Sequence, residues 1–191
     1  MSLIILGDVS GKGLKAAMAV SLIVGLVRAL APLISDPGKL LAEINERLFG
    51  RLQGGFATAL ALRLDAQGNC DLACAGHLAP FVNGEELSLP GAFPLGIANS
   101  VAYDTIHFQV RSSDRLALFT DGLLEARSAS GELYGYERLQ TLFAAKRTAT
   151  QATRAAVEFG QEDDITVLIL TRLGIGEVST SEYTAAIFAQ A

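Results

Sequence analysis

Basic residues, cysteines and long apolar runs are all scarce in this sequence. Its 191 residues include 15 lysines and arginines against 20 acidic residues, which gives a net charge of -5. No basic surface of the kind that binds a nucleic-acid backbone is therefore expected. The two cysteines, Cys70 and Cys74, lie about 13 Å apart if their segment is a strand, which is too far for a disulfide. Free thiols and the absence of a signal peptide favour a reducing, cytoplasmic setting.

The longest apolar stretch is also too short for a membrane helix. It runs from Ala16 to Val27, and Arg28 and Pro32 follow closely, whereas a bilayer needs about 20 apolar residues. We interpret this stretch as a buried helix, and we expect no membrane association. The length of the chain and its 50% content of hydrophobic residues predict one globular domain with a sizeable core.

The order of predicted elements indicates an α+β layered domain rather than a parallel doubly wound sheet. Asp36 before Pro37 is typical of a helix start, with a capping side chain and a proline in the first turn. Residues 102–110 and 115–119 are predicted to pair through the turn at 111–114. The expected strands are 4–6, 56–64, 70–75, 80–82, 86–89, 102–110, 115–119 and 165–171, and the expected helices are 14–33, 37–48, 136–146 and 150–159.

Three acidic positions stand at the ends of predicted strands. Asp8 follows the apolar residues 4–6, Asp121 follows 116–119, and Asp163 with Asp164 precedes 165–170. A single Asp at such a place usually caps a turn. Strand ends of one sheet converge, however, and several carboxylates in one place repel unless a cation neutralises them. Oxygen ligands without His or Cys suit Mg²⁺ or Mn²⁺ better than zinc.

A series of ordered motifs resembles the PP2C-like protein phosphatases of the bacterial SpoIIE/RsbU branch. The similarity runs from about residue 4 to residue 171, and so many motifs in order make it specific. The motifs are Gly7-Asp-Val-Ser-Gly-Lys-Gly13 with Ala16-Ala17, Asn45, Phe56-Ala-Thr58, Ala75-Gly-His-Leu-Ala-Pro80, Pro94-Leu-Gly96, Phe119-Thr-Asp-Gly-Leu-Leu-Glu-Ala126, Tyr134-Gly135 and Asp163-Asp-Ile-Thr166.

The resemblance implies a fold and a metal centre. The fold is a PP2C-like α-β-β-α sandwich of two antiparallel sheets flanked by helix pairs, formed by residues 1–172. The metal centre holds two Mn²⁺ or Mg²⁺ ions: Asp8 bridges them, the backbone carbonyl of Val9 binds the second ion, and Asp121 and Asp163 hold the first. These three aspartates are thereby the implied catalytic residues.

The implied reaction is hydrolysis of phosphoserine or phosphothreonine by a metal-activated water, because two adjacent cations lower the pKa of a shared water and polarise the phosphoryl oxygens. No covalent intermediate is needed, which agrees with the absence of a convincing nucleophile. Of the two histidines, we interpret His77 as structural and His107 as a partly exposed sheet residue. Eukaryotic relatives carry a histidine that acts as general acid at the position of Ser10.

The sequence departs from the family at its start. The family begins with further strands that carry a Gly-Gly-Asp motif, and no such segment is present here, so we expect an N-terminally incomplete domain with a weakened second metal. An uncovered strand edge invites pairing. We therefore predict that the chain either forms a homodimer through this edge or folds Tyr183–Phe188 across it. Residues 173–191 lie outside the resemblance and are expected to be a tail or an additional strand.

The motifs leave two alternatives to a phosphatase to compare, a phosphate-binding loop and a pseudophosphatase. A phosphate-binding loop of the P-loop type would place its leading glycine at Leu6 and its Ser/Thr at Gly13, so the spacing excludes it. A pseudophosphatase that binds a phosphoprotein without turnover is the stronger alternative. By resemblance, the expected partners are a phosphorylated regulatory protein, namely a STAS-type anti-sigma-factor antagonist, and an upstream sensor or receiver domain.

Overall fold

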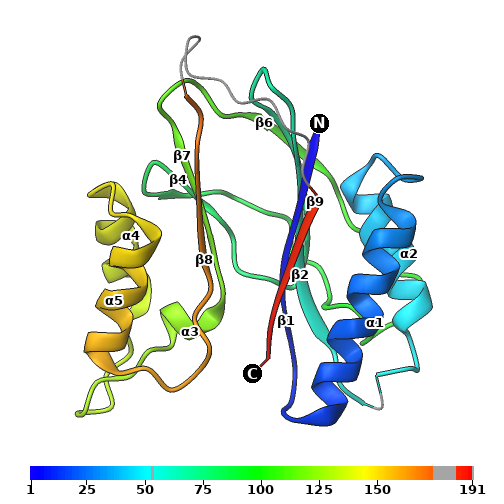
Figure 1. Cartoon of the computed structure of the whole chain (residues 1–191), viewed down its shortest axis with the longest axis horizontal. Helices are drawn as coiled ribbons and strands as arrows, with labels where there is room; N and C mark the ends of the chain where they lie inside the picture. Colours follow the sequence, from blue (N-terminus) through cyan, green and yellow to red (C-terminus); the bar gives the residue numbers. More distant parts are fainter. Residues whose placement is uncertain (53, 174–183, 191) are drawn as a thin grey trace. The chain divides into compact units, whose positions relative to one another are not determined.

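Two separate β-sheets, each with its own helices, make up most of the chain (Figure 1). The computed structural model describes residues 1–52, 54–173 and 184–190. Within them the chain divides into two compact units: residues 1–77 and 89–109 with the last strand form the first, and residues 78–88 and 110–173 form the second.

The sheet of the first unit has five strands in the order β6-β3-β2-β1-β9. β1 lies between β2 and β9, antiparallel to β2 and parallel to β9. β3 is antiparallel to both β2 and β6. The strands are β1 (Ser2–Val9), β2 (Ala57–Leu64), β3 (Asn69–Ala75), β6 (Ile106–Gln109) and β9 (Thr184–Gln190).

Two helices, α1 (Leu14–Leu30) and α2 (Pro37–Leu48), pack on this sheet and on each other (Figure 1). The predicted start of α2 is confirmed: the Asp36 carboxylate accepts a hydrogen bond from the Lys39 N–H, and Pro37 occupies the first turn. α1 is packed as expected, because Ile23 and Val27 are fully buried. Its outer face exposes apolar side chains, among them Leu14 and Met18.

The sheet of the second unit has four strands in the order β5-β4-β7-β8, all antiparallel. The rings of Phe81, Phe119 and Phe143 meet at centroid distances of 5.4–5.7 Å in its core. Its elements are β4 (Phe81–Val82), β5 (Glu85–Glu86), β7 (Arg115–Phe119), α3 (Asp121–Leu124), α4 (Gly135–Ala144), α5 (Ala149–Gly160) and β8 (Val167–Thr171).

One expected strand pair is wrong. The segments that contain β6 and β7 were predicted to form a hairpin, but β6 pairs with β3 in the first sheet, whereas β7 pairs with β4 and β8 in the second. The turn between them exists, since the Asp114 N–H donates to the Arg111 carbonyl. The chain uses this turn to pass from one unit to the other.

The last described strand covers one edge of the first sheet. β9 pairs with β1 over Leu3–Val9, so the region predicted to fold across this edge does so from residue 184 on, while Tyr183 lies outside the described residues. The other alternative, pairing with a second copy of the chain, stays a prediction. Among the described residues, no helix has the length and apolar character required to cross a membrane.

Candidate functional site

Asp8 lies in the first unit, one residue before β1 ends. Its side chain is 8% exposed, which makes it one of the few charged groups inside the protein. The strand pairing sets it opposite Thr58 of β2. Burial of a carboxylate is costly unless a cation or hydrogen bonds compensate for the lost water. Asp8 thus lies near the end of a strand that is buried over most of its length.

Asp121 and Asp163 form a pair of neighbouring carboxylates in the second unit. Asp121 is the first residue of α3 and is half-buried. Burial raises the pKa of its carboxyl above the ordinary value, and the nearby charge of Asp163 raises it further, although backbone hydrogen bonds from Gly122 and from its own N–H act in the opposite direction. A carboxylate whose ionised form is disfavoured by burial and by a neighbouring carboxylate is a place where a divalent cation binds well.

Thr120 holds the two loops that carry this pair. Its buried hydroxyl donates to the Asp164 carbonyl (3.3 Å) and accepts from the Thr166 N–H (2.9 Å), while its own N–H donates to the Thr166 carbonyl (3.0 Å). Gly122 allows the two loops to approach this closely, because a Cβ at this position would overlap the Asp164 carbonyl. The Asp-Gly and Asp-Asp motifs are thus fixed against each other by a buried threonine and a glycine.

The donor atoms are of the kind that a hard divalent cation prefers. The first unit offers the Asp8 carboxylate and the Val9 carbonyl, and the second unit offers the carboxylates of Asp121 and Asp163. Mg²⁺ and Mn²⁺ prefer such oxygen ligands. Asp163 is further organised because its Oδ1 accepts from the Asp164 N–H at 2.7 Å. In the part of the chain that the structure describes, no three or more His, Cys, Asp or Glu side chains are gathered closely enough to hold a metal by themselves.

The loop that follows β1 lines a pocket of about 400 Å³, which begins at Val9. Ser10 fixes one wall: its hydroxyl accepts from the Phe56 N–H at 2.8 Å, and its N–H donates to the Phe56 carbonyl at 2.9 Å. Among the described residues, the charged ones that line this pocket are Lys12 and Lys15, both exposed, and none is acidic. A pocket with two ammonium groups favours an anion.

The histidines and cysteines have structural surroundings. The Nδ1 atom of His77 lies 2.8 Å from the Thr58 hydroxyl, and the Cys74 thiol donates to the His77 carbonyl. His107 is exposed in β6 and pairs with Asp71 at 2.6 Å. Both cysteines are buried thiols outside any disulfide, and burial raises the pKa of the Cys74 thiol. Neither histidine is among the residues that line the pocket after β1.

The sequence matches the family model of stage II sporulation protein E (SpoIIE) over residues 2–173. The chain belongs to the SpoIIE family. SpoIIE proteins are PP2C-like serine/threonine phosphatase domains, so the family and the fold agree with the motifs that carry Asp8, Asp121 and Asp163. None of the curated protein sequences matches this SpoIIE chain.

Solved structures share the fold of this SpoIIE domain. The RsbU and RsbW domains of Rv1364c from Mycobacterium tuberculosis match with 20% identity and a TM-score of 0.69, over 90% of this chain and 59% of that chain. The SiaA-PP2C domain of Pseudomonas aeruginosa matches with 22% identity and a TM-score of 0.72, over 86% and 73%. RsbX in complex with magnesium matches with 16% identity and a TM-score of 0.61, over 83% and 75%. At these identities the likeness shows the fold alone.

The sequence predicted the acidic site residues of this domain, but it did not predict the residues that hold the acidic loops in place. Thr120 and Thr166 belong to the sequence motifs, but the motifs gave no role for them. Their mutual hydrogen bonds depend on the pairing of β7 with β8. α3 was also missed, because four residues are too few for a helical period. Asp163 precedes β8 by a turn rather than directly, since the strand begins at Val167.

Proposed function

We propose that this protein is a metal-dependent phosphoprotein phosphatase that hydrolyses phosphoserine or phosphothreonine in a regulatory protein. The observation that carries the proposal is the half-buried Asp121 beside Asp163. Burial and the charge of Asp163 destabilise the ionised form of Asp121, and a bound cation would relieve this. Membership of the SpoIIE family supports the same activity. The proposed phosphatase domain is residues 1–172.

The proposed ligands are all oxygen atoms. Asp121 and Asp163 would hold one Mn²⁺ or Mg²⁺ ion, and Asp8 with the carbonyl of Val9 would hold the second. The magnesium complex of RsbX, which has the same fold, supports the choice of metal. The buried Thr120 and Gly122 keep the Asp121 and Asp163 loops in fixed positions, so that little ordering is needed when the ion binds.

Bound divalent ions would supply a water of lowered pKa and would polarise the phosphoryl oxygens. The protein's own part is to attract and orient the phosphorylated side chain. Lys12 and Lys15 place positive charge around the pocket that follows β1, which favours a phosphoryl dianion. The Ser10 hydroxyl, fixed by the Phe56 N–H, keeps its own proton as a donor toward this pocket.

The proposed substrate is a phosphorylated regulatory protein of the STAS type, an anti-sigma-factor antagonist. The similarity to a chain that contains both RsbU and RsbW domains supports a place in such a regulatory system. This chain spans 59% of that relative. A sensor or receiver domain as the controlling partner, and a cytoplasmic location, belong to the same proposal.

Hydrolysis of para-nitrophenyl phosphate tests the activity directly. The purified chain should release nitrophenolate when Mn²⁺ is added and lose this activity with EDTA. The variant Asp163→Asn should lower the Mn²⁺-dependent rate by about a hundredfold, which is typical for removal of one electrostatic group at a reaction centre. The matched control is Asp104→Asn, an exposed aspartate on the first unit, which should keep the full rate. Equal rates in both variants would refute the assignment.

A pseudophosphatase is the second candidate function. It is favoured by the finding that no three metal-binding side chains are gathered in the described part of the chain. Calorimetry with a phosphoserine peptide separates the two: binding of the peptide with no release of phosphate under any Mn²⁺ concentration would support the second candidate, and Mn²⁺-dependent release of phosphate would exclude it.

A further inference from the structure

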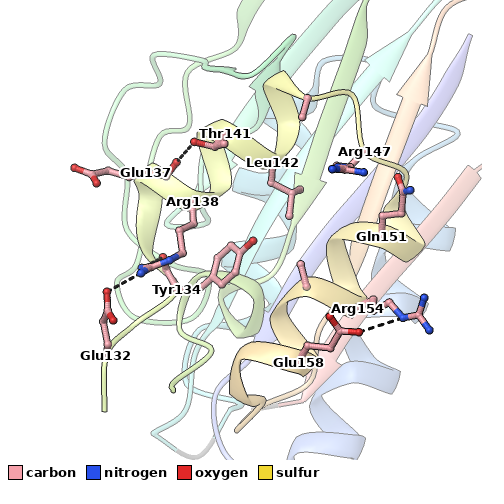
Figure 2. A pocket seen from close by; sticks show the side chains of 12 residues that line it. Glu132, Tyr134, Glu137, Arg138, Thr141, Leu142, Arg147, Gln151, Arg154 and Glu158 are labelled. Carbon is pink, nitrogen blue, oxygen red and sulfur yellow. Dashed lines mark hydrogen bonds and ion pairs between the residues drawn. The ribbon is translucent and has the colours of Figure 1, made fainter. Parts of the chain in front are cut away.

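A groove of about 790 Å³ lies between α4 and α5 in the second unit (Figure 2). None of the proposed metal ligands lines it, so it is a separate feature of the domain. Its volume falls in the range of small-molecule sites. The lining residues are Glu132, Tyr134, Glu137, Arg138, Thr141, Leu142, Ala145, Arg147, Gln151, Arg154, Ala155 and Glu158.

Most of the charges in the groove are already paired. Arg138 donates to Glu132 (2.7 Å) and to two backbone carbonyls, and it lies 5.0 Å over the ring of Phe159. Arg154 contacts Glu158 at 3.4 Å. Glu137 points away from the groove in Figure 2. The guanidinium of Arg147 makes no ion pair or hydrogen bond with any residue that the structure describes, and Figure 2 shows it directed into the space between the helices.

The backbone of Arg147 is held in place although its side chain is not. Its carbonyl accepts a hydrogen bond from the Arg115 guanidinium at 2.6 Å. Lys146 before it adopts a left-handed conformation (φ 53°), and Thr148 after it caps α5 together with Gln151. The unpaired cation is thus fixed at its base, and the entropy lost when it engages a ligand is smaller than for a residue in a mobile loop.

Tyr134 provides a second donor from the floor of the groove. Its side chain is 8% exposed, and its ring packs edge-on against Phe159 at 5.3 Å. No residue of the described chain forms a hydrogen bond with its hydroxyl, which points between α4 and α5 in Figure 2. The residue is mostly buried, but its hydroxyl is accessible at the groove, where it can donate a hydrogen bond to a ligand.

Gln151 adds a third donor, since its Oε1 already accepts from the Thr148 N–H and only its NH₂ group remains available. The side-chain donors of Arg147, Tyr134 and Gln151 thus have no partner among the described residues, and such donors bind an anion well. Apolar groups, chiefly Leu142 and Ala155, complete the lining. We propose that the groove between α4 and α5 binds an organic anion, whose carboxylate or phosphoryl head is held by Arg147, Gln151 and Tyr134 and whose apolar body lies against Leu142 and Ala155.

Nuclear magnetic resonance titration with two probes tests this site. Phenylacetate presents a carboxylate and benzylphosphonate a phosphoryl group on the same benzyl body, while benzyl alcohol and benzylamine are the neutral and cationic counterparts. Both anions should shift amide signals of α4 and α5 in a saturable way, and the two counterparts should not. The ratio of the two anion affinities identifies which head group the groove prefers.

Three variants make the test specific. Arg147→Gln, which leaves the carbonyl that Arg115 contacts, should weaken anion binding about tenfold or more, as expected for a charge-assisted hydrogen bond. Tyr134→Phe keeps the ring against Phe159 and removes only the hydroxyl, so binding should weaken about threefold to tenfold. Arg28→Gln removes one exposed cation from α1 and should leave binding unchanged.

Three results would overturn the proposal. The first is shifts spread over the whole surface without saturation, and the second is equal binding of benzyl alcohol and the anions. The third is an Arg147→Gln variant that binds the anions as the unmodified protein does. The thermal unfolding temperature of each variant distinguishes a lost contact from lost folding. If Arg147→Gln unfolds at a lower temperature than the unmodified protein, it is replaced by Arg147→Lys, which keeps the charge and should retain part of the affinity.

Discussion

The variant Asp121→Asn should make the metal-free protein more stable. Burial and the charge of Asp163 together raise the pKa of the Asp121 carboxyl, so the ionised side chain opposes folding. Asparagine keeps a side-chain oxygen that can accept the same backbone hydrogen bonds. Asp121 is half-exposed, and we therefore expect a gain in the free energy of unfolding of at most about 1 kcal/mol, the size of an interaction between partly exposed charges.

The pH dependence of this gain has a definite sign. A carboxyl whose pKa is raised in the folded state stabilises the fold below the ordinary Asp pKa, where it is protonated in both states, and this stabilisation is lost as the pH rises through the raised value. The advantage of Asp121→Asn should thus be absent in acid and appear at neutral pH. Urea unfolding in EDTA, repeated between about pH 4 and pH 8, measures it.

Manganese should reverse the order of the two proteins. A ligand that binds only the folded state stabilises it by about 2.7 kcal/mol at a hundred times its Kd. The unmodified protein should show a gain of this kind with saturating Mn²⁺, while Asp121→Asn gains much less because one metal ligand is missing. The unmodified protein is then the more stable of the two, although it was the less stable one in EDTA.

The matched control is Asp114→Asn, which changes the net charge equally. The side chain of Asn83 and the backbone N–H of Arg111 donate hydrogen bonds that lower the pKa of the Asp114 carboxyl. This variant should lose stability above the ordinary Asp pKa and keep the full Mn²⁺ gain. An Asp121→Asn protein that is destabilised in EDTA, or that gains as much from Mn²⁺ as the unmodified protein, would refute the reasoning.

Three further variants test other parts of the structure. Gly122→Ala should lower stability by about 1–3 kcal/mol and reduce Mn²⁺-dependent hydrolysis, because its Cβ overlaps the Asp164 carbonyl; Gly25→Ala in the exposed middle of α1 has free space and should stabilise instead, by up to about 1 kcal/mol. Asn45→Ala should lower the free energy of unfolding in urea by about 2–3 kcal/mol, because the buried amide accepts a hydrogen bond from the Gly96 N–H and donates one to the Ala98 carbonyl. Deletion of residues 174–191 should uncover the edge of β1 and produce a concentration-dependent dimer in light scattering; a truncated chain that stays monomeric would contradict the edge argument.

The sequence by itself determined the features that depend on local chemistry. The start of α2 was predictable because Asp36 caps it and Pro37 fixes its first turn. The strands β2 and β3 were predicted to within a residue because each is a mainly apolar segment bounded by turn residues. The acidic residues at strand ends, and the family they indicate, were likewise readable from motifs.

Only the tertiary structure decided which distant segments meet. The side chains of a strand alternate in the same way whichever neighbour it pairs with. Nothing in residues 106–119 therefore showed that β6 and β7 belong to different sheets. The sequence likewise did not show that β9 pairs with β1 in the parallel direction. The groove between α4 and α5 depends on such contacts too. Tyr134 stood out in the sequence only as part of a motif and Arg147 not at all, and they become a candidate anion site only because the packing of α4 and α5 brings them to one groove.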